Sequence, residues 1–311
     1  MNPKIKGYIL GAVAAATYGT NPLFALPLYG EGMNADSVLF FRYIFAVPVI
    51  AAMLKMRGHS FTVAKSDLLP LAFMGVMMAL SSLLLFESYN YMDVGIASTL
   101  LFVYPLMVAA IMAIFFKERL SPFTIFCIVL ALGGIALLFK ASDGATLSLF
   151  GVILVMVSSL TYSIYIIGVN RPGLRSVPTL KVIFYVLCVG ALMFAAKIAI
   201  TSGSHFSVPL KWYMWFCILA LAVLPTVVSF ICTTAAIQYI GPTPTAILGA
   251  LEPVTAVAIG ILVFGETLTP RNWLGMVLIV AAVSFVVAGG NITGALVRFR
   301  KLFPRIISHK K

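Results

Sequence analysis

The sequence predicts an all-α integral membrane protein with ten transmembrane helices, arranged as two inverted five-helix repeats. Its 311 residues are 62% hydrophobic and 10% charged, and their mean hydropathy is +1.09. A water-soluble domain of this size cannot bury so much apolar surface. Apolar stretches such as 100–116 and 277–288 lack the strict alternation of β-barrel strands, so the spans are predicted to be helices. The second half of the chain also repeats the first.

Ten segments are long enough to cross a membrane as helices. A hydrocarbon core about 30 Å thick requires about 20 apolar residues per helix. Such segments cover residues 7–29, 37–56, 67–89, 94–116, 122–140, 148–168, 178–200, 212–238, 244–264 and 272–290. The first is too long for the apolar region of a cleaved signal peptide, so we expect it to be a true span. Pro22 and Pro27 in this segment, and Pro225 in the eighth, mark points where a helix is expected to bend.

The repeat is clearest around two proline-containing segments. Tyr104-Pro105 recurs as Glu252-Pro253, and the residues around them match at the same offset. A second alignment pairs Tyr18 with Tyr162 near the start of each half. The predicted parts are a first five-helix repeat at 1–140, a second at 148–290 and a basic cytoplasmic tail at 291–311.

Basic residues gather on one side of the predicted spans, and short cytoplasmic loops carry such an excess. This side has Lys4, Lys6, Lys55, Arg57, Lys65, Lys117, Arg119, Arg171, Arg175 and the basic tail. The other side has Lys140, Lys197, Lys211 and Arg271. We therefore expect both termini on the cytoplasmic side of the inner membrane, and this topology explains the net charge of +12 without a nucleic-acid partner. Because each repeat has five spans, the second enters from the opposite side, a plan common in secondary transporters.

One part of the second repeat resembles a known family. The segment Leu251-Glu252-Pro253-Val254, with Gly260, Phe264-Gly265-Glu266, Trp273 and Gly275 after it, is similar to the hallmark of the EamA family in the drug/metabolite transporter superfamily. Phe41-Arg42-Tyr43 resembles the family's early arginine motif. The resemblance covers essentially the whole chain. It implies ten helices in an inverted duplication, cytoplasmic termini, and transport of amino acids, other small metabolites or sugars, or flipping of lipid-linked intermediates.

The first predicted helix departs from a related group. Small multidrug-resistance proteins depend on a carboxylate in their first helix, whereas the helix here has Thr17, Tyr18, Thr20 and Asn21 and no acid. Proton and drug antiport through that position is therefore not expected. A carboxylate coupled to transport must lie elsewhere in the chain.

Glu252 is the leading candidate for that carboxylate. It lies about eight residues into the ninth predicted span, where an ionised carboxylate is costly unless it is paired or solvated. It is expected either to bind a proton or a substrate amine, or to make a structural hydrogen bond near Pro253. Arg42, in the second predicted helix, is expected to be structural or gating, through pairing with a buried acid or a substrate carboxylate, or else to reach the outer interface.

A substrate site is expected where the two repeats meet. Tyr18 and Tyr162 are repeat equivalents, so a pseudo-twofold axis would place both at one midplane site. Further candidate binding residues are Asn21, Glu87, Tyr104 and Glu252, with Glu87 at the mouth of a cavity or solvated at the interface. Pro105 and Pro253 each remove a backbone hydrogen bond within a span and are expected to flank the cavity.

Enzyme chemistry is not indicated. The chain has no GxxxxGK or HExxH motif, and its three histidines lie outside the predicted spans. No metal site and no cofactor are expected. We expect a secondary active exporter of small organic metabolites, most favourably amino acids, that works by alternating access in the lipid bilayer, with proton coupling through Glu252 as a hypothesis. The alternatives are a lipid-intermediate flippase and a non-transporting channel or scaffold, and the oligomeric state stays open.

Overall fold

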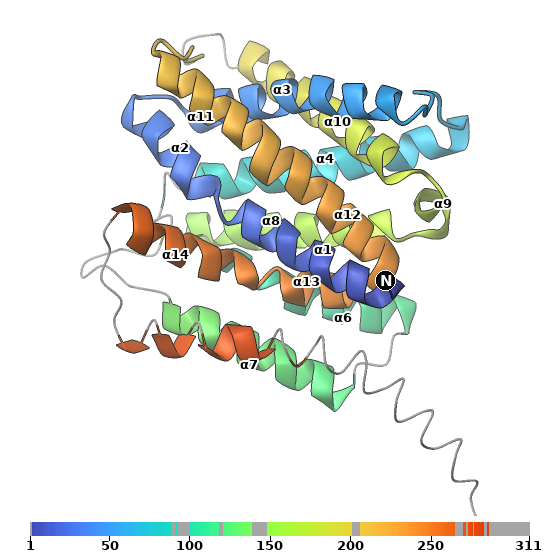
Figure 1. Ribbon diagram of the computed structural model, residues 1–311, viewed down its shortest axis with the longest axis vertical. Coiled ribbons are helices and arrows are strands. Elements are labelled where there is room, and N and C mark those ends of the chain that lie inside the picture. The colour runs from blue at the N-terminus through green and yellow to red at the C-terminus, as the bar shows by residue number, and fades with distance from the viewer. Residues whose placement is uncertain are drawn as a thin grey trace, which may run out of the picture.

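The computed structural model describes residues 2–88, 91, 97, 100–117, 121–138, 148–200, 206–264, 270–271, 273–275, 277–282 and 285. In these ranges all regular structure is helical (Figure 1). The helices are α1 (Pro3–Tyr18), α2 (Asn21–Gly30), α3 (Ala35–Met56), α4 (Lys65–Ser88), α6 (Tyr104–Phe116), α7 (Pro122–Leu138), α8 (Leu149–Val169), α9 (Pro172–Arg175), α10 (Thr179–Ile200), α11 (Trp212–Ala222), the π-helix η1 (Val223–Val228), α12 (Ser229–Ile240), α13 (Pro242–Leu248) and α14 (Leu251–Phe264).

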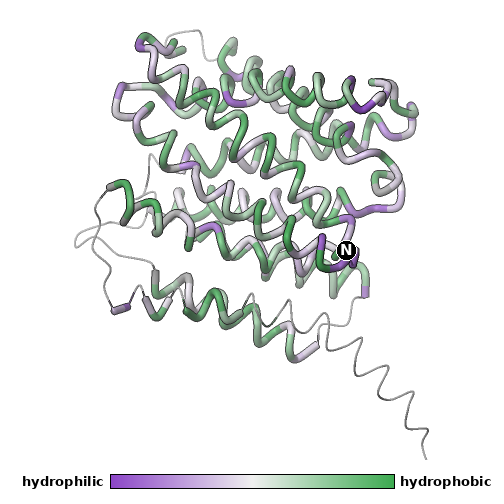
Figure 2. Tube along the Cα trace, in the orientation of Figure 1, coloured by the Kyte–Doolittle hydropathy of each residue, from purple (hydrophilic) through white to green (hydrophobic). Residues whose placement is uncertain are grey.

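Six helical segments of the described chain are long and apolar enough to cross a membrane. They are Pro3–Gly30, Ala35–Met56, Lys65–Ser88, Leu149–Val169, Thr179–Ile200 and Trp212–Ile240. Shorter apolar helices cover Tyr104–Phe116, Pro122–Gly134 and Trp273–Ala282. Apolar residues line the middle of most helices and polar residues gather near their ends (Figure 2). The multi-pass helical membrane fold is confirmed, and the count of ten spans stays a prediction.

The two halves of the chain pack into each other. Helix α1 packs against α12 of the second half, and α8 packs in the same way against α4 of the first half. Helices α3 and α10, the second long span of each half, lie side by side and run in opposite directions (Figure 1). Helices α1 and α8 also run in opposite directions (Figure 1). The molecule therefore has a two-repeat architecture in which the halves cross-pack.

The two ends of the helix bundle differ in charge. At one end, Lys197 pairs with Asp36 at 2.8 Å and with Glu87 at 3.7 Å, and Lys211 pairs with Glu31 at 2.7 Å. We call this the ion-pair end. All three ion pairs of the described residues join an acid of the first half to a lysine of the second half.

The opposite end carries an excess of basic side chains, and we call it the basic end. It includes Lys4, Lys6, Lys55, Arg57, Lys65, Lys117 and Arg171. Lys6 lies over the ring of Tyr239 at 5.2 Å, and Arg171 lies over the ring of Phe116 at 4.1 Å. The halves therefore meet through cation–π contacts at this end and through ion pairs at the other.

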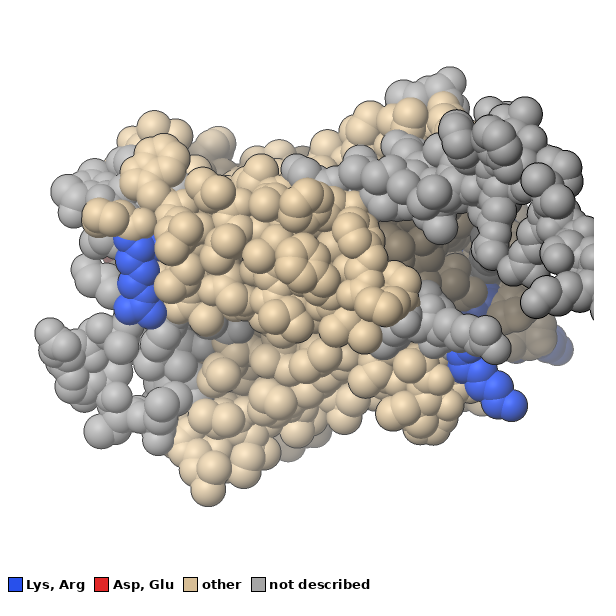
Figure 3. All heavy atoms as spheres, turned by 90° about the horizontal axis from the view of Figure 1, so that it is seen from below, with Lys and Arg blue, Asp and Glu red and all other residues tan. Residues whose placement is uncertain are grey.

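Helix α7 and the described residues between 270 and 285 form an apolar outer face. Phe126, Val129 and Val277 expose 52%, 63% and 57% of their surface. Figure 3 views the molecule from this side, and most of the described surface there carries no charge, with Lys and Arg near its margins. Such a face is suited to contact with lipid hydrocarbon.

Four of the predicted spans are interrupted in their described parts, and the bends expected at Pro22 and Pro225 take the form of a helix break and a π-helix. The span predicted at 7–29 divides into α1 and α2 after Tyr18, because Pro22 has no N–H to donate to the Tyr18 carbonyl. The span predicted at 212–238 contains the π-helix η1, which includes Pro225. The span predicted at 244–264 divides into α13 and α14 at Gly249 and Ala250.

Pro105 and Pro253 occupy the first turns of new helical segments. Pro105 follows the first residue of α6, and Pro253 is the third residue of α14. A turn at Phe102 and Val103 precedes α6, as the break at Gly249 and Ala250 precedes α14. First-turn N–H groups have no partner within a helix, so a proline costs little there. Both prolines are therefore tolerated at these positions, and their expected part in flanking the cavity stays a prediction.

Candidate functional site

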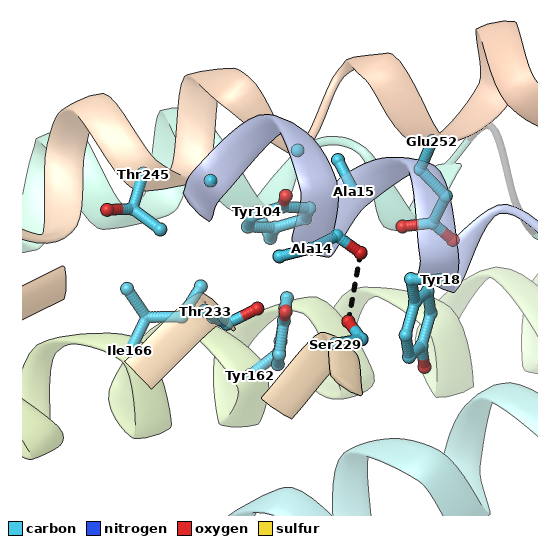
Figure 4. A pocket seen from close by; sticks show the side chains of 12 residues that line it. Ala14, Ala15, Tyr18, Tyr104, Tyr162, Ile166, Ser229, Thr233, Thr245 and Glu252 are labelled. Atoms are coloured by element: carbon cyan, nitrogen blue, oxygen red, sulfur yellow. Dashed lines mark hydrogen bonds between the residues drawn. The ribbon is translucent and has the colours of Figure 1, made fainter. Parts of the chain in front are cut away.

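A small polar cavity lies where the two halves cross (Figure 4). It is lined by Gly11, Ala14, Ala15 and Tyr18 of α1, Tyr104 of α6, Tyr162 and Ile166 of α8, Ser229 and Thr233 of α12, and Thr245, Gly249 and Glu252 of the α13–α14 segment. The Ser229 hydroxyl donates a 3.0 Å hydrogen bond to the Ala14 carbonyl. The cavity has room for about one water molecule. A substrate larger than that requires the helices to move apart.

Three tyrosines supply most of the aromatic surface of the cavity. The rings of Tyr104 and Tyr162 meet edge to face, with centroids 4.9 Å apart, and Tyr162 stacks on Tyr165 at 6.3 Å. Tyr18 lies at the opposite side of the cavity, close to Glu252 (Figure 4). Aromatic faces carry partial negative charge, so this group can hold a cation or an apolar chain.

Tyr104 reaches into the break between α13 and α14. Its hydroxyl donates a 3.1 Å hydrogen bond to the carbonyl of Ala246, one of the last carbonyls of α13. A Cβ atom at Gly249 would lie 1.6 Å from this hydroxyl oxygen. The break therefore needs glycine at position 249, because any larger residue would displace Tyr104.

Glu252 lies in the first turn of α14 and is partly buried. The partial positive charge of a helix N-terminus favours a carboxylate at this position. No residue of the described chain donates a hydrogen bond to this carboxylate or forms an ion pair with it, and Figure 4 shows it pointing toward Tyr18. Helix α1 approaches closely, since a Cβ at Gly19 would lie 2.6 Å from the Glu252 carbonyl oxygen. The carboxylate thus lines the cavity without a hydrogen-bond partner among the described residues.

An equivalent close approach occurs in the other repeat, where it includes a hydrogen bond. Ser163 of α8 donates a 3.1 Å hydrogen bond to the carbonyl of Tyr104, as α1 passes the carbonyl of Glu252 at Gly19. Tyr104 and Glu252 are repeat equivalents, so each half presents one of them beside the first helix of a repeat. The cavity therefore lies where equivalent segments of the two repeats meet.

Arg42 is buried beside this site, with 3% of its surface exposed. Its Nε donates to the Thr226 hydroxyl, its Nη2 to the Pro225 carbonyl at 3.1 Å, and its Nη1 to Asn21 Oδ1 at 3.1 Å. Its guanidinium lies 5.5 Å from the ring centre of Tyr18. The alternative in which Arg42 reaches the outer interface is therefore wrong, because the guanidinium is held among α2, η1 and α1.

The π-helix η1 explains why Arg42 finds acceptors there. Pro225 interrupts the α-helical ladder, and the Thr226 hydroxyl donates a 2.8 Å bond back to the Leu221 carbonyl. The hydroxyl oxygen and the Pro225 carbonyl then both face Arg42. One buried side chain thus connects the irregular part of one span to the break in another.

The structure gathers four of the predicted binding residues, Tyr18, Tyr104, Tyr162 and Glu252, around one cavity. Asn21 lies just beyond Tyr18 and is bonded to Arg42. Glu87 pairs with Lys197 at the ion-pair end, with its side chain 38% exposed, and does not line the cavity. Its assignment to a cavity mouth stays a prediction.

Sequence reasoning missed several lining residues. Gly249, Thr245 and Ile166 line the cavity without having been singled out. For Gly249 a signal exists, because a glycine two residues before Leu251 and four before Pro253 is typical of a helix break. For Thr245 and Ile166 the sequence carries no such signal, since a threonine or isoleucine in an apolar helix is ordinary.

An all-helical membrane fold of two cross-packed repeats around a polar cavity defines a membrane transporter, not an enzyme. The profile of the EamA-like transporter family matches residues 5–140 and 149–288. The chain belongs to the EamA-like transporter family.

Named relatives and a solved structure agree with this family. The threonine/homoserine exporter RhtA of Escherichia coli strain K12 is 28% identical over 278 residues, which are 88% of this chain and 88% of that protein. The uncharacterized inner membrane transporter YicL of Salmonella typhimurium is 25% identical over 291 residues, 90% of this chain and 95% of its own length. A crystal structure at 17% identity has a TM-score of 0.76 and covers 90% of this chain and 95% of its own, which shows the fold.

Proposed function

We propose that this protein is a secondary active exporter of a small polar organic metabolite, with amino acids as the leading class. The observation that carries the proposal is the cavity in which Tyr18, Tyr104, Tyr162 and Glu252 come together from both repeats. A similar protein named as a threonine/homoserine exporter supports the amino-acid class.

The cavity suits a substrate that carries an ammonium group. Glu252 offers a carboxylate without a protein partner among the described residues, and Tyr104 and Tyr162 offer aromatic faces beside it. A carboxylate and π faces both favour a cation, and the effect is larger in a desolvated site. We propose that Glu252 binds either the substrate ammonium or a proton, so that the two species exchange across the membrane.

Alternating access would use the interruptions of the spans. The breaks after Tyr18 and at Gly249 lie next to the cavity, and they can change angle without disrupting a continuous helix. We propose that the basic end is cytoplasmic, following the positive-inside rule, so that both termini are cytoplasmic and the ion-pair end faces outward. The proposed repeat boundaries are 1–140 and 148–290, with a basic tail at 291–311.

Countertransport in liposomes tests this function. The purified protein would be reconstituted with an unlabelled amino acid, nucleoside or sugar inside, and uptake of the labelled compound would be followed with and without a pH gradient. Saturable exchange of amino acids supports the proposal. Exchange of another class alone would overturn the amino-acid assignment. Silence with every soluble compound, together with movement of a labelled lipid between leaflets, would replace it with the flippase alternative.

A further inference from the structure

Arg42 is a buried cation whose charge no described side chain neutralises by contact. Its three hydrogen bonds go to neutral acceptors, the Thr226 hydroxyl, the Pro225 carbonyl and the Asn21 amide oxygen. None of the ion pairs found in the described residues involves it. A charge inside a membrane protein is costly without a counter-charge, and such residues commonly mark substrate pathways.

Tyr18 lies beside both Arg42 and an acidic residue, Glu252. Arg42 lies 5.5 Å from the centre of the Tyr18 ring, and Tyr18 and Glu252 line the same cavity, with the Glu252 carboxylate pointing toward Tyr18 (Figure 4). No ion pair joins Arg42 to Glu252 among the described residues. The site therefore has a positive pole and a negative pole separated by one aromatic side chain.

The guanidinium has N–H groups left for another acceptor. The three bonds use one N–H each of Nε, Nη1 and Nη2, so one N–H remains on each Nη. The Tyr18 hydroxyl lies close enough to compete for one of them until Tyr18 turns aside. A carboxylate can accept from a guanidinium fork through both oxygens. The three existing bonds hold the fork in place, so binding a carboxylate there would cost little side-chain entropy.

We propose that Arg42 is a specificity-determining residue that receives the carboxylate of a zwitterionic substrate whose ammonium binds at Glu252. This inference rests on the proposed function and narrows it to molecules that carry both charges, such as α-amino acids. A cation alone would leave Arg42 uncompensated, and an anion alone would leave Glu252 uncompensated. Tyr18, which separates the two poles, has to turn aside when the substrate enters.

Three matched compounds test the proposal in reconstituted liposomes. They are threonine, its amino alcohol threoninol, which lacks the carboxylate, and 2,3-dihydroxybutanoate, which lacks the ammonium. If the site has two poles, threonine inhibits exchange of labelled threonine at a concentration at least about tenfold lower than either analogue, since each analogue loses a charge-assisted bond. Equal inhibition by threonine and threoninol in the wild type would overturn the proposal.

Variants distinguish recognition from a structural role. In Arg42→Gln, the preference for threonine over threoninol should fall to about twofold or less, whereas Arg42→Lys should retain part of it because the charge remains. Lys211→Gln is the control, since it removes a basic charge that pairs with Glu31 at the ion-pair end and lies outside the cavity lining. The control should alter the exchange of all compounds alike and leave their ratio unchanged.

The outcomes separate failure of this inference from failure of the proposed function. If the wild type exchanges no amino acid, both fall. If it exchanges threonine while folded Arg42→Gln keeps the wild-type ratio, only the inference falls and Arg42 serves the structure. Melting temperature and elution volume in detergent establish that each variant is folded. If Arg42→Gln does not fold, the comparison of threonine with threoninol in the wild type and in Arg42→Lys decides whether the proposal holds.

Discussion

Glu252 and Tyr104 occupy equivalent positions in the two repeats, yet only one of them carries an acid. Tyr104 uses its hydroxyl to hold the Ala246 carbonyl beside the break in the other repeat, whereas Glu252 has no such bond among the described residues. The two halves therefore share a backbone plan and differ in chemistry at the same point. Because only the second repeat has an acid at this position, only one side of the cavity offers a carboxylate to a cation.

Replacing Glu252 by glutamine should abolish the response to a pH gradient while the protein stays folded. The change keeps the shape of the side chain and removes its charge and titration. We expect the concentration for half-maximal exchange of the substrate to rise about tenfold or more, since a bond to a charged group is lost. Countertransport measured with and without a pH gradient checks this.

Glu87→Gln is the matched control for that experiment. Glu87 is an acid of the other repeat that pairs with Lys197 outside the cavity lining, so its replacement should leave the response to the gradient intact. A wild-type response in Glu252→Gln would reduce Glu252 to a structural residue.

At the scale of single helices, the sequence predicted only some of the breaks within the membrane spans. Pro22 and Pro225 were recognised as points where helices bend, because proline lacks an N–H. The outcome at each point, a break in one span and a π-helix in the other, depends on contacts distant in sequence. Arg42 and Thr226 stabilise the π-helix, and Tyr104 fills the gap at Gly249. No local pattern reports such contacts.

Gly249→Ala should disrupt the α13–α14 break. The new Cβ would overlap the Tyr104 hydroxyl, and overpacking of this kind typically costs about 1–3 kcal/mol. We expect a lower melting temperature and slower exchange. The second change Tyr104→Phe removes the overlapping oxygen and should recover part of both losses, although the bond to Ala246 stays lost. A double variant no better than Gly249→Ala would show that the overlap is not the cause.

For the whole molecule, the sequence predicted the class, the duplication and the family correctly, because these depend on composition and on features repeated along the chain. Cross-packing of the halves could not be predicted, since it depends on which helix surfaces meet. The ion pairs show this. Asp36 and Lys197 lie in segments far apart in sequence, and only the folded structure reveals that they pair.

The ion-pair end should act as a closure between the repeats. Exchanging the charges of one pair tests this. Asp36→Lys or Lys197→Asp alone should favour opening at this end and change the exchange rate about 1.4- to 5-fold, because a partly exposed pair is worth about 0.2–1 kcal/mol. The double exchange should return the rate only part of the way toward wild type, because an acid at position 197 would repel Glu87. Single variants indistinguishable from wild type would assign the closure to other contacts.

Lowering the pH from 8 to 5 should not break the Glu31–Lys211 ion pair. Hydrogen bonds from Lys211 and Tyr213 hold the pKa of Glu31 below its usual value. Stabilisation by this group is present above the unfolded pKa of about 4.3 and is lost only as the pH falls through the lowered folded value. The difference in melting temperature between wild type and Glu31→Gln should therefore stay constant from pH 5 to pH 8 and shrink in stronger acid. A difference that disappears by pH 6 would contradict it.

The small size of the central cavity limits the leakage of protons through it. A proton moves through a membrane along a continuous file of hydrogen-bonded waters, whereas this cavity has room for about one. In the described conformation this cavity cannot itself hold such a file. Proton leakage through it would therefore be confined to the moments when the helices part.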